Sequence, residues 1–156
     1  MKKILFGLAG IVVMGIGYHL ISPLWRTVKI EDARPAEMQT ATEINPAQSS
    51  STASTILARG IFKRQAHDVK GEALVIQNGE NKTLRFENFK TINGPDLRVY
   101  LSADLDAKDS IDLGPIRGTE GNINYTIPSG TDHKKYTYVL IWCRAFRVLF
   151  SYALLQ

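Results

Sequence analysis

The chain reads Gly-Glu-Ala-Leu-Val-Ile-Gln-Asn-Gly-Glu-Asn-Lys-Thr-Leu-Arg-Phe-Glu-Asn-Phe over residues 71–89. Two apolar runs in this stretch flank an Asn-Gly pair at positions 78–79. Asn-Gly between apolar runs is a strong hairpin signal, because both residues accept the positive φ angles that a tight type I′ turn requires. The stretch therefore predicts an antiparallel hairpin, with Leu84, Phe86 and Phe89 on its buried side.

The β pattern continues toward the C-terminus. Residues 97–102 alternate between aliphatic and more polar side chains, which is typical of a half-buried strand. Further strands are expected at 122–127, 136–143 and 146–154, and at most one helical turn at 104–110. Short strands at this spacing predict an all-β domain, an antiparallel β-sandwich or barrel-like fold. By the two-residue period of a strand, one face of the last run would carry Phe146, Val148, Phe150, Tyr152 and Leu154.

A membrane segment is predicted at the N-terminus. Lys2 and Lys3 precede 22 uncharged residues, 4–25, which is close to the roughly 20 residues that cross a bilayer as a helix. Residues 1–29 are therefore interpreted as an uncleaved signal-anchor, a single transmembrane helix that leaves the rest of the chain extracytoplasmic at the cell membrane. The alternative is a cleaved signal peptide and a secreted protein, although no small-residue cleavage pattern follows the apolar core.

The rest of the chain divides into a linker and a domain. Residues 30–56 are rich in Ser, Thr, Ala and Pro without an apolar period, so they are interpreted as a flexible linker. Residues 57–156 form the β domain, long enough for one modest core without disulfides. The formal charge of +4 comes from scattered Lys and Arg residues rather than from a basic block. This pattern argues against nucleic acid as a partner.

The domain resembles a known family, the DM-thirteen domain, a small extracytoplasmic module found alone in bacteria and beside DOMON domains in animal proteins. Two runs are the most specific when taken together: Asn-Gly-Pro-Asp-Leu at 93–97, and Trp-Cys-x-x-Phe at 142–146. The other matching positions are Gly60, Phe62, His67, Gly71, Ala73, residues 84–89, residues 98–102, Leu113, Gly114, Gly121, Tyr125, Ile127, Pro128, Tyr136, Ile141, Phe150 and Ala153. The resemblance covers the whole domain.

The resemblance implies an all-β module with a characteristic cysteine, here Cys143. In the family that cysteine is proposed to serve redox chemistry or electron transfer, as a bare thiol or through a prosthetic group such as haem. A redox protein partner would follow from that role. The residues themselves leave the role of Cys143 open. A lone thiol forms no intramolecular disulfide, so packing, ligation and thiol chemistry with another molecule all stand. Arg144 would favour the thiolate if the two side chains approach.

Three further residues are candidates for binding a cofactor. His67 is suited to ligation or proton transfer, or to a structural hydrogen bond in its turn. Asp96 follows the Gly-Pro turn, and its carboxylate either locks that turn or faces a ligand, paired with Arg85 or Arg98. Trp142 packs in the core or stacks on a ligand. The sequence identifies no metal.

Two functions follow from the sequence. The first is a membrane-tethered extracytoplasmic module for redox chemistry or electron transfer through Cys143, as a thiol or cofactor ligand. The second is a non-enzymatic ligand-binding or cell-surface interaction module whose cysteine is buried and structural. No zinc set, P-loop, nucleophile elbow or Cys-x-x-Cys-His run occurs, and no arrangement of residues supports hydrolysis or group transfer.

Overall fold

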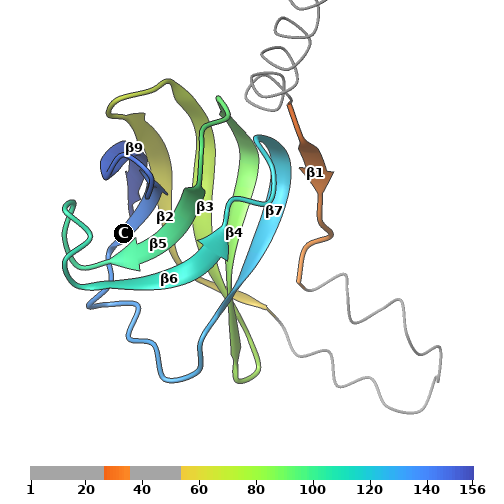
Figure 1. The fold of residues 1–156 in the computed structure, drawn as a ribbon. Helices are drawn as coiled ribbons and strands as arrows, with labels where there is room; N and C mark the ends of the chain where they lie inside the picture. The colour runs from red at the N-terminus through yellow and green to blue at the C-terminus, as the bar shows by residue number, and fades with distance from the viewer. Residues whose placement is uncertain (1–26, 36–53) are drawn as a thin grey trace, which may run out of the picture.

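The computed structural model describes residues 27–35 and 54–156 (Figure 1). These residues form nine β-strands and no helix, which confirms the all-β prediction. The strands are β1 Lys29–Glu31, β2 Thr55–Arg64, β3 Val69–Asn78, β4 Asn81–Thr91, β5 Leu97–Ser102, β6 Ser110–Pro115, β7 Glu120–Ile127, β8 Tyr138–Cys143 and β9 Val148–Leu154.

All nine strands belong to one curled sheet, a half-barrel that wraps around the core (Figure 1). The strand order is β1-β7-β4-β3-β2-β9-β8-β5-β6. Every pair is antiparallel, as predicted, except β1 with β7, which is parallel. The pairing of β2 with β9 joins one part of the sheet, β1, β7, β4, β3 and β2, to the other, β9, β8, β5 and β6.

The predicted hairpin is present as β3 and β4, with Asn78 paired to Asn81, but its turn residues are Gly79 and Glu80 rather than Asn78 and Gly79, and only Gly79 has a positive φ. Leu84, Phe86 and Phe89 are all buried, as expected. An uninterrupted strand would place Phe86 and Phe89 on opposite faces. A bulge between them, where Asn88 has a φ of 49°, turns both rings into the core. There they contact each other and the ring of Phe62.

Two sequence predictions for the C-terminal part are wrong. Phe146 does not lie on the same strand face as Phe150, because it belongs to the β8–β9 turn and is 70 % exposed. Within β9, a register shift separates Phe150, which is buried, from the half-exposed Tyr152. The helical turn expected at 104–110 is also absent. The carboxylate of Asp104 instead holds an irregular turn by accepting backbone N–H groups.

The first strand lies where the sequence analysis placed the boundary of anchor and linker. Ile30 in β1 packs against the core, and β1 adds a parallel strand along β7. A strand of three residues is too short to show a hydrophobic period in the sequence. Its contacts are with residues some 90 positions further along the chain, which no local pattern reveals. The predicted membrane segment, 4–25, and most of the predicted linker, 36–53, lie outside the described residues. Within the described residues, no helix is long and apolar enough to cross a bilayer.

Gly121 allows β1 to approach β7. Its φ is +112°, and a Cβ at this position would overlap the carbonyl oxygen of Ile30. Gly114 has almost the same φ, +113°, but a Cβ there would meet nothing within 4 Å. Comparing alanine substitutions at the two glycines therefore distinguishes the cost of backbone strain from the cost of losing the contact with β1.

We expect Gly114→Ala to cost the backbone strain alone. Gly121→Ala should cost about 1 to 2 kcal/mol more, because it also breaks the β1 ladder. Urea denaturation of both variants measures this difference. Hydrogen exchange of the Asp32 amide, which donates to the Asn122 carbonyl, reports on β1 directly. Equal losses in the two variants, with an unchanged Asp32 amide, would contradict the assigned contact.

Candidate functional site: a buried thiol beneath a loop

Cys143 is the last residue of β8 and is fully buried. Alternation along β8 turns Cys143 into the core together with Val139 and Ile141, while Trp142 points to the opposite face of the sheet. Cys143 pairs with Leu97 of β5 and Val148 of β9, so it has a neighbouring strand on each side.

The loop over residues 93–96 closes the remaining side of the thiol. The Sγ–H group of Cys143 donates to the carbonyl oxygen of Pro95 at 3.1 Å. The next residue, Arg144, holds the loop twice. Its backbone N–H donates to the Asp96 carbonyl at 3.1 Å, and its guanidinium Nε donates to the Asp96 carboxylate at 2.6 Å. Access to the sulfur therefore requires this loop to move.

The loop is packed tightly from below. A Cβ on Gly94 would lie 2.8 Å from the ring of Phe150, so only glycine brings the loop this close to the core. The His67 ring also packs against the Phe150 ring, with 4.0 Å between ring centroids. The backbone N–H of His67 also donates to the Phe150 carbonyl. Gly94, Phe150 and His67 thus form one packed group beside the cysteine loop.

The four predicted site residues are only partly brought together. Asp96 and Cys143 meet at the same loop, and His67 lies at the same end of the barrel through its contact with Phe150. Trp142 lies on the opposite face of the sheet. The expected partners of Asp96 were wrong, because Arg144 pairs with it. Arg98 instead pairs with Asp112, and Arg85 with Glu87.

Trp142 lines a surface groove of about 520 Å³ on that opposite face. Its other lining residues are Tyr100, Asp106, Ala107, Ser110, Asp112, Arg144 and Arg147. The sulfur of Cys143 points away from this groove, since consecutive residues of a strand face opposite sides. The groove is therefore separated from the thiol by the sheet itself.

The surroundings of Cys143 do not fit a haem ligand. Its sulfur is buried and donates a hydrogen bond to the Pro95 carbonyl. The His67 ring packs against the Phe150 ring, and no hydrogen bond among the described residues joins it to the sulfur. Nor do any three His, Cys, Asp or Glu side chains of the described segments converge on a metal position. As arranged, the site is that of a protected thiol.

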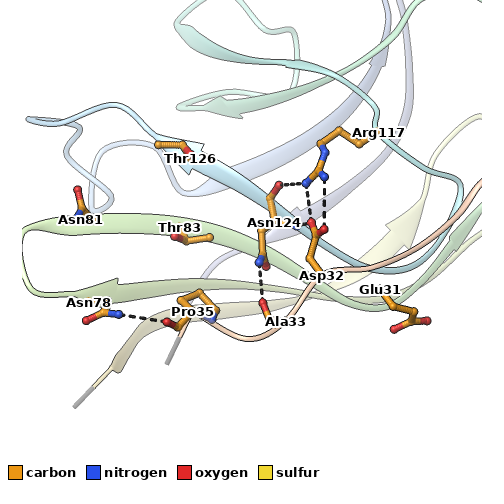
Figure 2. Close-up of a pocket in the computed structure, with 10 residues that line it drawn as sticks. All are labelled: Glu31, Asp32, Ala33, Pro35, Asn78, Asn81, Thr83, Arg117, Asn124 and Thr126. Atoms are coloured by element: carbon orange, nitrogen blue, oxygen red, sulfur yellow. Dashed lines mark hydrogen bonds and ion pairs between the residues drawn. The ribbon is translucent and has the colours of Figure 1, made fainter. Parts of the chain in front are cut away.

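A second feature, which the sequence analysis did not identify, is a polar groove of about 660 Å³ (Figure 2). It lies where residues 31–35 cross the outer surface of β3, β4 and β7. Ten residues line it: Glu31, Asp32, Ala33, Pro35, Asn78, Asn81, Thr83, Arg117, Asn124 and Thr126.

Asp32 is the central residue of this groove. Its carboxylate accepts the Asn124 backbone N–H at 2.8 Å and forms an ion pair with Arg117 (Figure 2). Burial alone would raise the pKa of Asp32. The hydrogen bond from Asn124 and the Arg117 guanidinium outweigh burial, so the pKa of Asp32 is lowered from its ordinary value. Arg117 also donates its backbone N–H to the hydroxyl of Tyr125, whose pKa burial raises to about 12.

Arg85 joins β1 to β4 from below the groove. It is buried, and its guanidinium donates to the backbone carbonyls of Asp32 and Ala33 and to the carboxylate of Glu87. Glu87 also pairs with Arg34. The sequence carries no signal for this network, because an arginine between Leu84 and Phe86 is what an alternating, half-buried strand places on its outer face.

These observations define a class of protein, a small half-barrel module whose single cysteine is sealed beneath a pinned loop. A comparison with protein-family models identifies the family. The model described as Electron transfer DM13 matches residues 61–155, and the chain belongs to this family. The resemblance drawn from the sequence is thereby confirmed. The family name associates its members with electron transfer. No curated protein and no solved structure matches the chain.

The Asp32 network makes a prediction about acid stability. Because the pKa of Asp32 is below 3.8 in the folded state, its charge stabilises the fold at pH values above 3.8. That contribution is lost as the pH falls through the lowered folded-state value. Asp32→Asn should reduce the free energy of unfolding by about 1 to 2 kcal/mol at neutral pH, and the difference should shrink in acid.

Urea denaturation across a pH series tests this. Asp106→Asn is the matched control, because Asp106 makes only an exposed ion pair with Lys108. A constant difference between wild type and Asp32→Asn down to strongly acidic pH would contradict the role given to the Asp32 charge.

Proposed function

We propose that this protein is a membrane-tethered, extracytoplasmic electron-transfer module that acts through the thiol of Cys143. Family membership supports the link to electron transfer, and the apolar run at residues 4–25 supports the tether. The observation that carries the role of Cys143 is its position beneath a loop held by the exposed Asp96–Arg144 ion pair. A free thiol outside the cytoplasm oxidises unless it is protected, and this loop protects it.

The chemistry open to one thiol is exchange with a disulfide of a redox protein partner. After the loop opens, the Cys143 thiol releases its proton to water. The resulting thiolate attacks one sulfur of the partner disulfide. A new sulfur–sulfur bond joins Cys143 to the partner, the old one breaks, and the other partner sulfur leaves as a thiolate that takes up a proton. The partner supplies the oxidising disulfide, so no further oxidant is required.

A second candidate is a non-enzymatic binding module with a structural cysteine. The complete burial of Cys143 favours it, since free cysteine commonly packs as a small apolar residue. In that function the ligand would bind at a surface groove such as the one in Figure 2, and Cys143 would remain inert in the native state.

Reaction of Cys143 with an aromatic disulfide reagent under native conditions distinguishes the two. Asp96→Asn removes the charge that holds the loop, while asparagine still accepts the positive φ of 52° at this position. An exposed ion pair is worth about 0.5 to 1 kcal/mol, so we expect reaction to become about two- to fivefold faster. The rate is followed by release of the coloured thiolate.

Asp106→Asn is again the control and should leave the rate unchanged. A rate that is equally slow in wild type and Asp96→Asn, and that rises only with global unfolding in urea, would contradict loop-gated thiol chemistry. That result would favour the structural cysteine.

Titration with haem tests the fit of the site independently. Because the sulfur is sealed, we expect no Soret band that depends on Cys143, so wild type and Cys143→Ala should give the same spectrum. A thiolate-type band present only in wild type would overturn the conclusion that the site does not fit haem.

A further inference from the structure

One end of the barrel brings together the thiol loop and the start of the first strand. Asp96 contacts Arg144, and the backbone N–H of Ala66 donates to the Phe150 carbonyl, so three connections between strands meet there. Lys29 pairs with Glu120, which pairs with Lys90 at the same end of β4. In Figure 1, β1 begins at the end where the β2–β3 and β4–β5 connections lie. We call this the thiol end, comprising residues 28–29, 64–70, 90–96, 119–120 and 144–148.

The thiol end carries exposed apolar side chains. Phe146 is 70 % exposed at the β8–β9 turn, and Ile92, which directly precedes the loop over Cys143, is 49 % exposed. Val28 and Val148 are also exposed. Seven large apolar side chains of the described residues are exposed, and these four of them lie at this one end. Such clustering at loop tips marks an interaction surface rather than scattered surface residues.

The thiol end is also positively charged. It carries six cations, Lys29, Arg64, Lys70, Lys90, Arg144 and Arg147, against three carboxylates, Asp68, Asp96 and Glu120. Each carboxylate is already paired with one of the cations. Among the described residues, Lys70 and Arg147 have no ion-pair partner. Arg147 directly follows Phe146, so an apolar tip has cationic flanks, the combination that binds anionic lipid at a bilayer interface.

The chain length outside the described residues agrees with this partner. The predicted anchor ends at Trp25 and β1 begins at Lys29, so these two Cα atoms lie at most about 14 Å apart. An anchor in the bilayer therefore holds the start of β1, which belongs to the thiol end, within about 14 Å of the end of the anchor. The predicted flexible linker, residues 30–56, begins only after Lys29, so it does not separate the predicted anchor from the start of the first strand.

We infer that the thiol end docks on an anionic bilayer surface, with Phe146 in the interfacial region and Arg147 and Lys70 at lipid phosphates. This inference rests on the tether in the proposed function. It orients the module, so that Cys143 opens toward the membrane and a partner that reaches it does so at the lipid surface.

Full-length protein in vesicles tests the docking. A single cysteine is placed at Phe146→Cys or, as control, Ser129→Cys, each with Cys143→Ala, and is labelled with a polarity-sensitive fluorophore. Ser129 follows β7 at the opposite end, and β7 itself spans about 23 Å from Glu120 to Ile127. Lipids with a quencher near the headgroup should quench the label at 146 several-fold more strongly than the label at 129, in vesicles containing phosphatidylglycerol.

Two further arms make the result decisive. Vesicles of phosphatidylcholine alone, or Arg147→Glu with Lys70→Glu, should reduce the quenching at 146. Hydrogen exchange of the unsubstituted protein should show the 144–147 amides slowed in anionic vesicles relative to detergent, independently of whether the cysteine variants fold. Equal quenching at both positions and unchanged exchange, in protein that resists alkaline extraction, would overturn the docking and leave the tether intact. Protein that alkaline extraction releases would overturn the tether and the docking together.

Discussion

The pairing of β2 with β9 holds this fold together, because it is the only ladder between the two halves of the described sheet. Gly60 makes it possible, since any side chain there would collide with the backbone of Leu154. Backbone bonds in both directions between Arg59 and Gln156 extend the pairing beyond β9. The thiol lies in the part of the sheet made of β9, β8, β5 and β6, and the Asp32 groove lies over β3, β4 and β7, so this ladder is the connection through the described sheet between the two.

The thiol site and the groove each contain an arginine–carboxylate ion pair, but the surroundings of the two pairs differ. At both, a short irregular segment is held on the sheet by an arginine and a carboxylate, Arg144 with Asp96 and Arg117 with Asp32. The first pair holds a loop over a reactive atom, and both of its side chains are partly exposed. The second belongs to a network that includes the buried Arg85 and several backbone groups. The cysteine loop is therefore the more easily released of the two segments.

Sequence predicted the parts of the fold that have a strong local signal. The β3–β4 hairpin follows from Asn78-Gly79, and β5 follows from the alternation at 97–102. The bulge that turns Phe89 inward and the register shift that separates Phe150 from Tyr152 break the two-residue period, so no periodic argument could find them. The sequence also pointed to Cys143 and Asp96 as candidate site residues, but it did not predict which arginine pairs with Asp96. Arg144 reaches it only because β5 and β8 are neighbours in the sheet.

The parallel strand β1 has a consequence for the solubility of the domain. β7 presents an unpaired row of backbone groups to any extended chain, and such edges are where proteins aggregate or exchange strands. β1 occupies the start of that row, and the side chains of Asp32 and Arg117 take the N–H and carbonyl of Asn124 further along. Residues 27–35 thus shield this edge of the sheet from self-association. A domain beginning at residue 57 would lack this edge protection and also the contact that Ile30 makes with the core.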